Sequence, residues 1–144
     1  MKFKLDEQAD PVTRLVERIE TFLEARAVPP KVVYAANLCV EELLVNIIKH
    51  GYGGGSASDV EVDVEVTPEA LIIEVSDGAP PFDPTRDSAD PDVDAELADR
   101  PIGGLGVHLI KKMTDGMTYR RVGQRNHVRL IKAMPDGAGA ATGD

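Results

Sequence analysis

A predicted helix over residues 30–50 carries a polar stripe whose side chains are suited to binding a metal and phosphate groups. Because each helical residue advances by about 100°, one arc of roughly 100° contains Glu42, Asn46, Lys49 and His50. The amide oxygen of Asn46 can ligate Mg²⁺, the ammonium group of Lys49 can meet phosphate oxygens, and Glu42 can accept a proton. The stripe therefore fits a metal–polyphosphate site, although taken alone it also fits a solvated helix face.

The second candidate feature is an acidic residue at the predicted end of a strand. Asp77 and Gly78 follow an apolar run that begins at Leu71. An ionised carboxylate only accepts hydrogen bonds, so Asp77 can take one from the N6 amino group of adenine, whereas guanine presents a carbonyl at that edge and would be repelled. The alternative is an ordinary strand-to-turn junction, because Asp and Gly both favour turns.

The third candidate feature is a glycine cluster at the start of a predicted helix over residues 103–114. Gly104, Leu105 and Gly106 would let the backbone approach a phosphate closely, and the free N–H groups of a helix N-terminus favour anions. The chain lacks the P-loop pattern Gly-x-x-x-x-Gly-Lys-Ser/Thr, and these glycines follow a long loop instead of a strand, which excludes a Rossmann fingerprint. A flexible entry to the helix is the simpler alternative.

The elements that would position these residues follow from hydrophobic periodicity. A period of two predicts strands and a period of 3.6 predicts helices. The predicted order is strand, helix, helix, strand, strand, helix, strand, strand, over residues 2–5, 11–26, 30–50, 60–66, 71–75, 103–114, 116–122 and 126–133. Asp10 is the predicted N-cap of the first helix, with Pro11 at its first position.

These elements predict an α/β (α+β) two-layer sandwich. The strands have one polar and one apolar face, and three amphipathic helices are available to cover the apolar face of a mostly antiparallel mixed sheet. A single domain is expected over residues 1–134. It contains a mobile, acidic and proline-rich loop at about 80–103 and is followed by a flexible tail at 135–144.

Composition excludes several classes of function. The 144 residues carry 16 basic and 25 acidic side chains, and the formal net charge of −9 with scattered basic residues argues against a nucleic-acid partner. No run approaches the roughly 20 apolar residues of a membrane span, and the first residues do not form a signal peptide, so a cytoplasmic protein is expected. The single cysteine, Cys39, cannot form an internal disulfide and is predicted to be a small buried side chain.

The three features occur in one order along the chain, which is more specific than any of them alone. In this combination the sequence resembles the Bergerat-type ATP-binding superfamily of gyrase, heat-shock chaperone, histidine-kinase and mismatch-repair ATPases. Within that superfamily it is most similar to the small anti-sigma-factor serine/threonine kinases of bacteria. The likeness extends from the first strand to about Lys132 and is most specific between Glu41 and Tyr52.

The resemblance implies roles for the candidate residues. Asn46 would hold Mg²⁺ and Glu42 would be the catalytic base, while Asp77 with Gly78 would recognise the adenine of ATP. Lys49 and His50 belong to the same nucleotide-binding motif. The residues that would lie against the phosphates, beneath a lid formed by the acidic segment 83–102, are Gly104, Leu105 and Gly106.

Two features depart from the family pattern. The family places Gly-Thr before the final strand, where this chain has Arg125 and Asn126, and Asn126 would supply a polar contact near the adenine. The acidic lid would repel the triphosphate unless it points outward or responds to Mg²⁺ and a partner.

The resemblance implies a protein serine/threonine kinase that acts as an anti-sigma factor with ATP and Mg²⁺. Its substrate would be an anti-sigma-factor antagonist, a STAS-type protein, with a sigma factor as the alternative partner, and a homodimer is plausible. The alternative is a nucleotide-gated protein-binding switch with little or no kinase activity. The catalytic half of a histidine kinase would need a helical hairpin with a phosphoacceptor histidine before the ATP-binding core, which this sequence does not contain.

Overall fold

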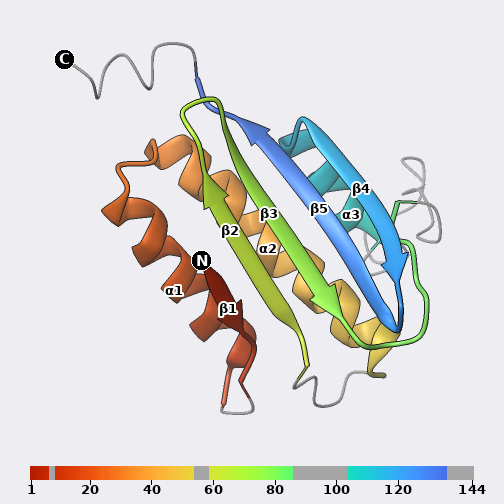
Figure 1. Ribbon diagram of the computed structural model, residues 1–144. Coiled ribbons are helices and arrows are strands. Elements are labelled where there is room, and N and C mark those ends of the chain that lie inside the picture. Colours follow the sequence, from red (N-terminus) through yellow and green to blue (C-terminus); the bar gives the residue numbers. More distant parts are fainter. Residues whose placement is uncertain (7–8, 54–58, 86–103, 136–144) are drawn as a thin grey trace.

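An antiparallel sheet and a layer of helices make up the computed structural model (Figure 1), which describes residues 1–6, 9–53, 59–85 and 104–135. The strands in this part are β1 (Lys2–Lys4), β2 (Glu61–Val66), β3 (Ala70–Asp77), β4 (Gly116–Val122) and β5 (Arg125–Ala133), and the helices are α1 (Pro11–Ala25), α2 (Pro30–Gly51) and α3 (Gly104–Met113). Helices α2 and α3 lie behind the sheet in Figure 1, and α1 packs against α2. The predicted two-layer sandwich is confirmed.

The sheet order is β1-β2-β3-β5-β4, and all four pairings within the described residues are antiparallel. The sequence predicts a mostly antiparallel sheet with some parallel pairing. Strands β3 and β4 do run in the same direction, but β5 lies between them and pairs with both in the opposite sense. The connection through α3 therefore joins strands that are not neighbours, and no parallel pair forms among the described strands.

The alternation along β2 determines which of its side chains are buried. Val62 and Val64 are buried, whereas Asp63 between them is exposed. Val62 pairs with Val75 of β3, and Val75 pairs with Val128 of β5, so one apolar row crosses the sheet. Apolar side chains of all three helices complete a single core.

Helix α1 begins at Pro11 as predicted, but Asp10 does not cap it through its side chain. A capping residue normally has an extended backbone, whereas Asp10 is left-handed (φ 53°, ψ 52°) and its side chain makes no capping hydrogen bond. Only its backbone oxygen takes part, by accepting a hydrogen bond from the N–H of Arg14 at 3.0 Å. The predicted N-cap position is confirmed, and Asp10 caps the helix through its backbone alone.

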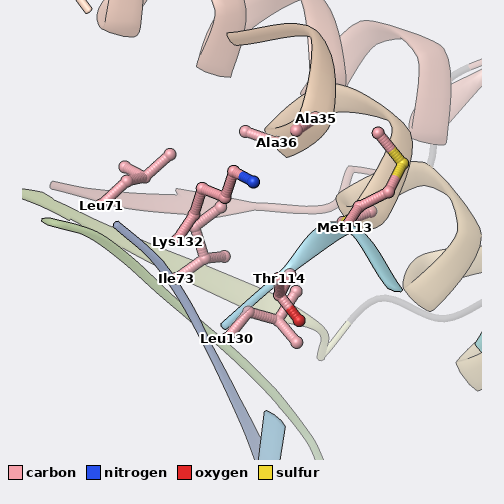
Figure 2. A pocket seen from close by; sticks show the side chains of 9 residues that line it. Ala35, Ala36, Leu71, Ile73, Met113, Thr114, Leu130 and Lys132 are labelled. Carbon is pink, nitrogen blue, oxygen red and sulfur yellow. The ribbon is translucent and has the colours of Figure 1, made fainter. Parts of the chain in front are cut away.

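Helix α2 packs one side into the core and carries the polar stripe on another. Cys39 is buried as predicted, and burial raises the pKa of its thiol to about 11. Figure 2 shows Met113 and Lys132 extending toward α2, where the small residues Ala35 and Ala36 leave space for long side chains. A cavity of only about 10 Å³ remains there, which indicates close packing between α2 and the sheet.

Predicted boundaries differ from the observed ones by at most two residues. The largest difference is at β3, which continues to Asp77, so Asp77 is held by the sheet and not by a turn. Most of the predicted mobile loop (residues 86–103) and nearly all of the predicted tail (residues 136–144) lie outside the described residues. None of the helices in the described residues combines the length and apolar character that a membrane span requires.

Candidate functional site

A pair of buried polar residues at one end of the sheet forms the centre of the candidate site. Asp77 ends β3 and pairs with Asn126 of β5, and the two residues are 3% and 2% exposed. The Nδ2 group of Asn126 donates a hydrogen bond to Oδ1 of Asp77 at 3.0 Å, and the backbone N–H of Ala79 donates to the same oxygen at 2.9 Å. Within the described residues no donor reaches Oδ2 of Asp77, so this oxygen can accept a hydrogen bond from a ligand.

Asn126 also anchors the turn after β3. Its Nδ2 donates to the backbone oxygens of Ala79 at 3.2 Å and Pro80 at 3.1 Å, and its Oδ1 accepts from the backbone N–H of Phe82 at 3.4 Å. Protein groups therefore occupy both ends of the Asn126 amide. A contact from Asn126 to adenine stays a prediction, whereas its contact with the adjacent Asp77 is direct.

The turn and the end of α2 enclose a small cavity next to Asp77. The cavity measures about 10 Å³, and Phe82 and Gly51 are among the residues that line it. The ring of Phe82 stacks on His50, with centroids 4.6 Å apart and an angle of 12° between the planes. A space of this size holds about one water molecule. An adenine ring can therefore enter only if the turn or the stack moves.

Close packing explains one glycine at this site, Gly51. A Cβ atom on Gly51 would lie 2.7 Å from Cβ of Ala79, whereas one on Gly78 would meet the far end of the exposed Asp59 side chain. Neither glycine has a positive φ angle, so conformational freedom is not the reason for them. The absence of a side chain on Gly51 allows α2 and the turn to approach each other closely.

Asp59 joins the segment before β2 to the ends of the central strands. Its carboxylate accepts a hydrogen bond from the hydroxyl of Tyr52 and lies 4.0 Å from Nη1 of Arg125. The Nη2 group of Arg125 donates to the backbone oxygen of Asp59 at 2.8 Å and to Oγ of Ser76 at 3.2 Å. Burial, and next the hydrogen bond to Asp59, raises the pKa of Tyr52, so its hydroxyl is a donor at neutral pH.

Asn46, the predicted metal ligand, is 1% exposed. Neither its Oδ1 nor its Nδ2 has a hydrogen-bond partner among the residues that the structure describes, which is rare for a buried amide. An amide oxygen of this kind suits Mg²⁺, which keeps waters and takes substrate phosphates as further ligands. The described residues contain no group of three His, Cys, Asp or Glu side chains able to hold a metal.

The other residues of the α2 stripe have different surroundings. Glu42 lies one helical turn before Asn46 and is half-buried, whereas Lys49 and His50 are exposed near the end of the helix. His50 stacks on Phe82, and Phe82 lines the Asp77 cavity. No contact in the described part of the chain joins Glu42 to that cavity.

The predicted phosphate-binding residues Gly104, Leu105 and Gly106 form the first turn of α3. The first N–H groups of a helix have no acceptors within it, so they are available to an anion. Helix α3 packs against α2, the helix that carries Asn46. The predicted lid, 83–102, is described only as far as residue 85.

Three residues of the site were not predicted from the sequence: Phe82, Tyr119 and Arg121. The hydroxyl of Tyr119 donates to Oδ1 of Asn126 at 2.6 Å, and Nη1 of Arg121 donates to the same oxygen at 3.1 Å. Arg121 also donates to the backbone oxygen of Ala79 at 2.7 Å. The available signal was the period of two in β4, which places Tyr119 and Arg121 on one face of the strand.

Comparison with known proteins agrees with this geometry. Residues 5–132 match the family described as "Histidine kinase-like ATPase domain". Over 97 residues the chain is 26% identical to the serine/threonine-protein kinase BtrW of Bordetella bronchiseptica. This alignment covers 67% of this chain and 68% of BtrW. Among solved structures, the Acinetobacter baumannii histidine kinase AdeS aligns with a TM-score of 0.53 and 17% identity over 94% of this chain and 68% of its own. This last likeness concerns the fold alone.

Proposed function

The chain belongs to the histidine kinase-like ATPase domain family, and we propose that it is an ATP-dependent protein serine/threonine kinase. Family membership supports ATP binding and kinase-like chemistry, and the similarity to BtrW supports the serine/threonine class. The observation that carries the proposal is the buried amide of Asn46, which has no partner among the described residues. It lies one turn after Glu42, on the helix whose end lines the Asp77 cavity.

Asp77 would recognise the base. Its Oδ2 accepts a hydrogen bond from the N6 amino group of adenine, while Oδ1 is held by Asn126 and Ala79. A carbonyl oxygen in place of that amino group would face the carboxylate without a hydrogen, which disfavours guanine and hypoxanthine. The N–H groups at the start of α3 and the ammonium group of Lys49 would bind the phosphates.

Glu42 would act as the general base. Its carboxylate accepts the proton of a serine or threonine hydroxyl on the protein substrate as that oxygen attacks the γ-phosphate and ADP leaves. Mg²⁺ held by Asn46 would neutralise phosphate charge. Positioning and charge neutralisation supply most of the catalysis in reactions of this class.

For the physiological role, we propose an anti-sigma factor in a partner-switching pathway. The substrate would be an anti-sigma-factor antagonist of the STAS type, and a sigma factor would be the alternative partner. The segment from Glu41 to Tyr52 resembles the anti-sigma-factor serine/threonine kinases, and this resemblance supports the assignment.

A pair of adjacent glutamates provides the test of the kinase proposal. Glu42→Gln should reduce phosphoryl transfer to a serine-bearing partner by at least about 100-fold, because it removes the general base, and should leave Mg·ATP binding unchanged. Glu41→Gln is the matched control, because it removes the same charge from the exposed neighbouring residue on the same helix. Transfer is measured with labelled ATP and binding by calorimetry. If the Glu42→Gln variant transferred phosphate at the rate of the wild type, Glu42 would be excluded as the general base.

The small size of the Asp77 cavity supports a second candidate function, the nucleotide-gated binding switch. Because the cavity beside Asp77 measures only about 10 Å³ and Phe82 lines it, a base bound there would displace the turn or the Phe82–His50 stack. A partner could respond to that change without phosphoryl transfer. Tight Mg·ATP binding, ATP-dependent partner binding and no label on the partner would favour the switch over the kinase.

A further inference from the structure

The amide of Asn126 is hydrogen-bonded on every side. Its Nδ2 donates to three acceptors and its Oδ1 accepts from three donors, which are groups of Asp77, Ala79, Pro80, Phe82, Tyr119 and Arg121. The amide therefore connects β3, the turn after it and β4 at one buried point.

These partners permit only one orientation of the amide. A guanidinium group only donates, so the atom that faces Arg121 at 3.1 Å must be the oxygen. An ionised carboxylate and backbone carbonyls only accept, so the atom that faces Asp77 and Ala79 must be the nitrogen. A flipped amide would set donor against donor and acceptor against acceptor.

The fixed amide in turn fixes the carboxylate of Asp77. Oδ1 receives two hydrogen bonds, from Nδ2 of Asn126 and the N–H of Ala79, and these two bonds come from different elements. Rotation of the carboxylate would break both. Oδ2 is thereby kept free of bonds from the described residues.

We propose that Asn126 is a positioning residue for base recognition, and that Tyr119 and Arg121 of β4 set its orientation. Asn126 holds Oδ1 of Asp77 so that Oδ2 is presented to the six-position of the purine. This inference rests on the proposed function, because it assumes that Asp77 meets the base.

The decisive variant is Asn126→Asp. It keeps an oxygen for Tyr119 and Arg121 and replaces the Nδ2 donor with an acceptor, so the bonds to Asp77, Ala79 and Pro80 are lost while the bonds to Oδ1 remain. The affinities for Mg·ATP and Mg·ITP are measured by calorimetry, because ITP differs from ATP at the six-position, where a carbonyl replaces the amino group. The preference for ATP should fall about tenfold in Asn126→Asp. A purely structural role would weaken both nucleotides equally and leave their ratio unchanged.

Asn37→Asp is the matched control. The Nδ2 group of Asn37 donates to Oε2 of Glu20 at 2.7 Å, so this change also sets a carboxylate against a carboxylate, but on the α1–α2 contact. The ATP-to-ITP preference of Asn37→Asp should equal that of the wild type.

Two variants of β4 cover the case in which Asn126→Asp does not fold. Tyr119→Phe removes one donor to Oδ1 of Asn126, and Arg121→Gln removes the donor-only group, so each should reduce the preference for ATP. Arg120→Gln is the control for Arg121→Gln, because Arg120 is exposed and bonds Glu74 at 3.2 Å. If Asn126→Asp is unfolded, a wild-type preference in both Tyr119→Phe and Arg121→Gln overturns the proposal.

The outcomes separate this proposal from the proposed function. A wild type that binds neither nucleotide, or that binds ATP and ITP equally, contradicts base recognition by Asp77 itself. A wild type that prefers ATP, together with a folded Asn126→Asp that keeps the same preference, leaves the kinase proposal intact and overturns the role of Asn126.

Discussion

Asp77 and Asn46 are both buried polar residues, but their hydrogen-bonding groups are satisfied to different degrees. One oxygen of Asp77 accepts two hydrogen bonds from the protein. Both polar atoms of Asn46 lack a partner in the described residues, and each such group costs roughly 1–3 kcal/mol when it is removed from water. An uncompensated cost of this size at a helix position that an apolar residue would fill is typical of a binding residue.

Replacement of Asn46 by leucine, which has a similar shape, tests this interpretation. Asn46→Leu should raise the free energy of unfolding without nucleotide by about 1 kcal/mol, because it removes two unpaired polar atoms from the interior. It should also abolish the Mg²⁺-dependent part of ATP binding. Urea unfolding and calorimetry measure the two effects.

Asn37→Leu is the control for this prediction. It removes one unpaired buried atom, Oδ1 of Asn37, but it also breaks the hydrogen bond between Asn37 and Glu20, so it should stabilise the protein less than Asn46→Leu does. A loss of stability in Asn46→Leu without nucleotide would contradict the interpretation, because it would mean that the amide is satisfied within the folded chain.

At the scale of elements, the site depends on how closely helix α2 approaches the turn after β3. Gly51 ends α2, and Ala79 of the turn lies against it with no room for a side chain. The backbone of Ala79 donates to Asp77 and accepts from Arg121. A change in the spacing between helix and turn is therefore transmitted to the carboxylate of Asp77, the proposed base-recognition group.

Gly51→Ala should destabilise the protein and weaken ATP binding. Alanine is favoured over glycine in a helix by about 1 kcal/mol, but a Cβ atom 2.7 Å from Cβ of Ala79 must push the turn away, and overpacking costs roughly 1–3 kcal/mol. Gly116→Ala is the control, because a Cβ atom there meets nothing within 4 Å. Thermal unfolding and ATP titration of the two variants give the comparison. Equal behaviour of the two variants would show that the turn moves aside at little cost.

The sequence predicted the elements better than it predicted the contacts between them. Periodicity located the helices and strands because it depends only on local spacing and burial. It also singled out Asp77 and Asn46, whose types are unusual beside apolar runs, and both are buried in the structure. It could not show that Asn126 holds Asp77, because that contact depends on the register of β3 with β5. The same applies to Arg121, which meets Asn126 only through the pairing of β4 with β5.

At the scale of the whole molecule, the site joins segments that are far apart in the chain. The end of α2, the turn after β3 and the start of β5 line one cavity, and β4 supports it from behind Asn126. A ligand that contacts several of these segments binds the folded chain and not the unfolded one. Ligand binding must therefore stabilise the entire domain.

Mg·ATP should accordingly raise the temperature of unfolding. At a concentration of 100 times Kd the stabilisation is about 2.7 kcal/mol, which corresponds to a shift of roughly 5–10 °C for a domain near this length. ATP without Mg²⁺ should give a smaller shift, because the ion that we propose Asn46 holds would be missing. Mg·ITP should also give a smaller shift, because its carbonyl would face Oδ2 of Asp77.

Asp77→Asn provides the internal comparison for this thermal series. The variant has a single amide oxygen, which can accept hydrogen bonds either from Asn126 and Ala79 or from the N6 amino group of adenine, but not from both. In either orientation the amide nitrogen, which is a donor, faces the remaining donors. The shift with Mg·ATP should therefore fall to about the value that Mg·ITP gives with the wild type. An unchanged shift in Asp77→Asn would assign base recognition to a group other than this carboxylate, whereas no shift in the wild type with millimolar Mg·ATP would contradict nucleotide binding itself.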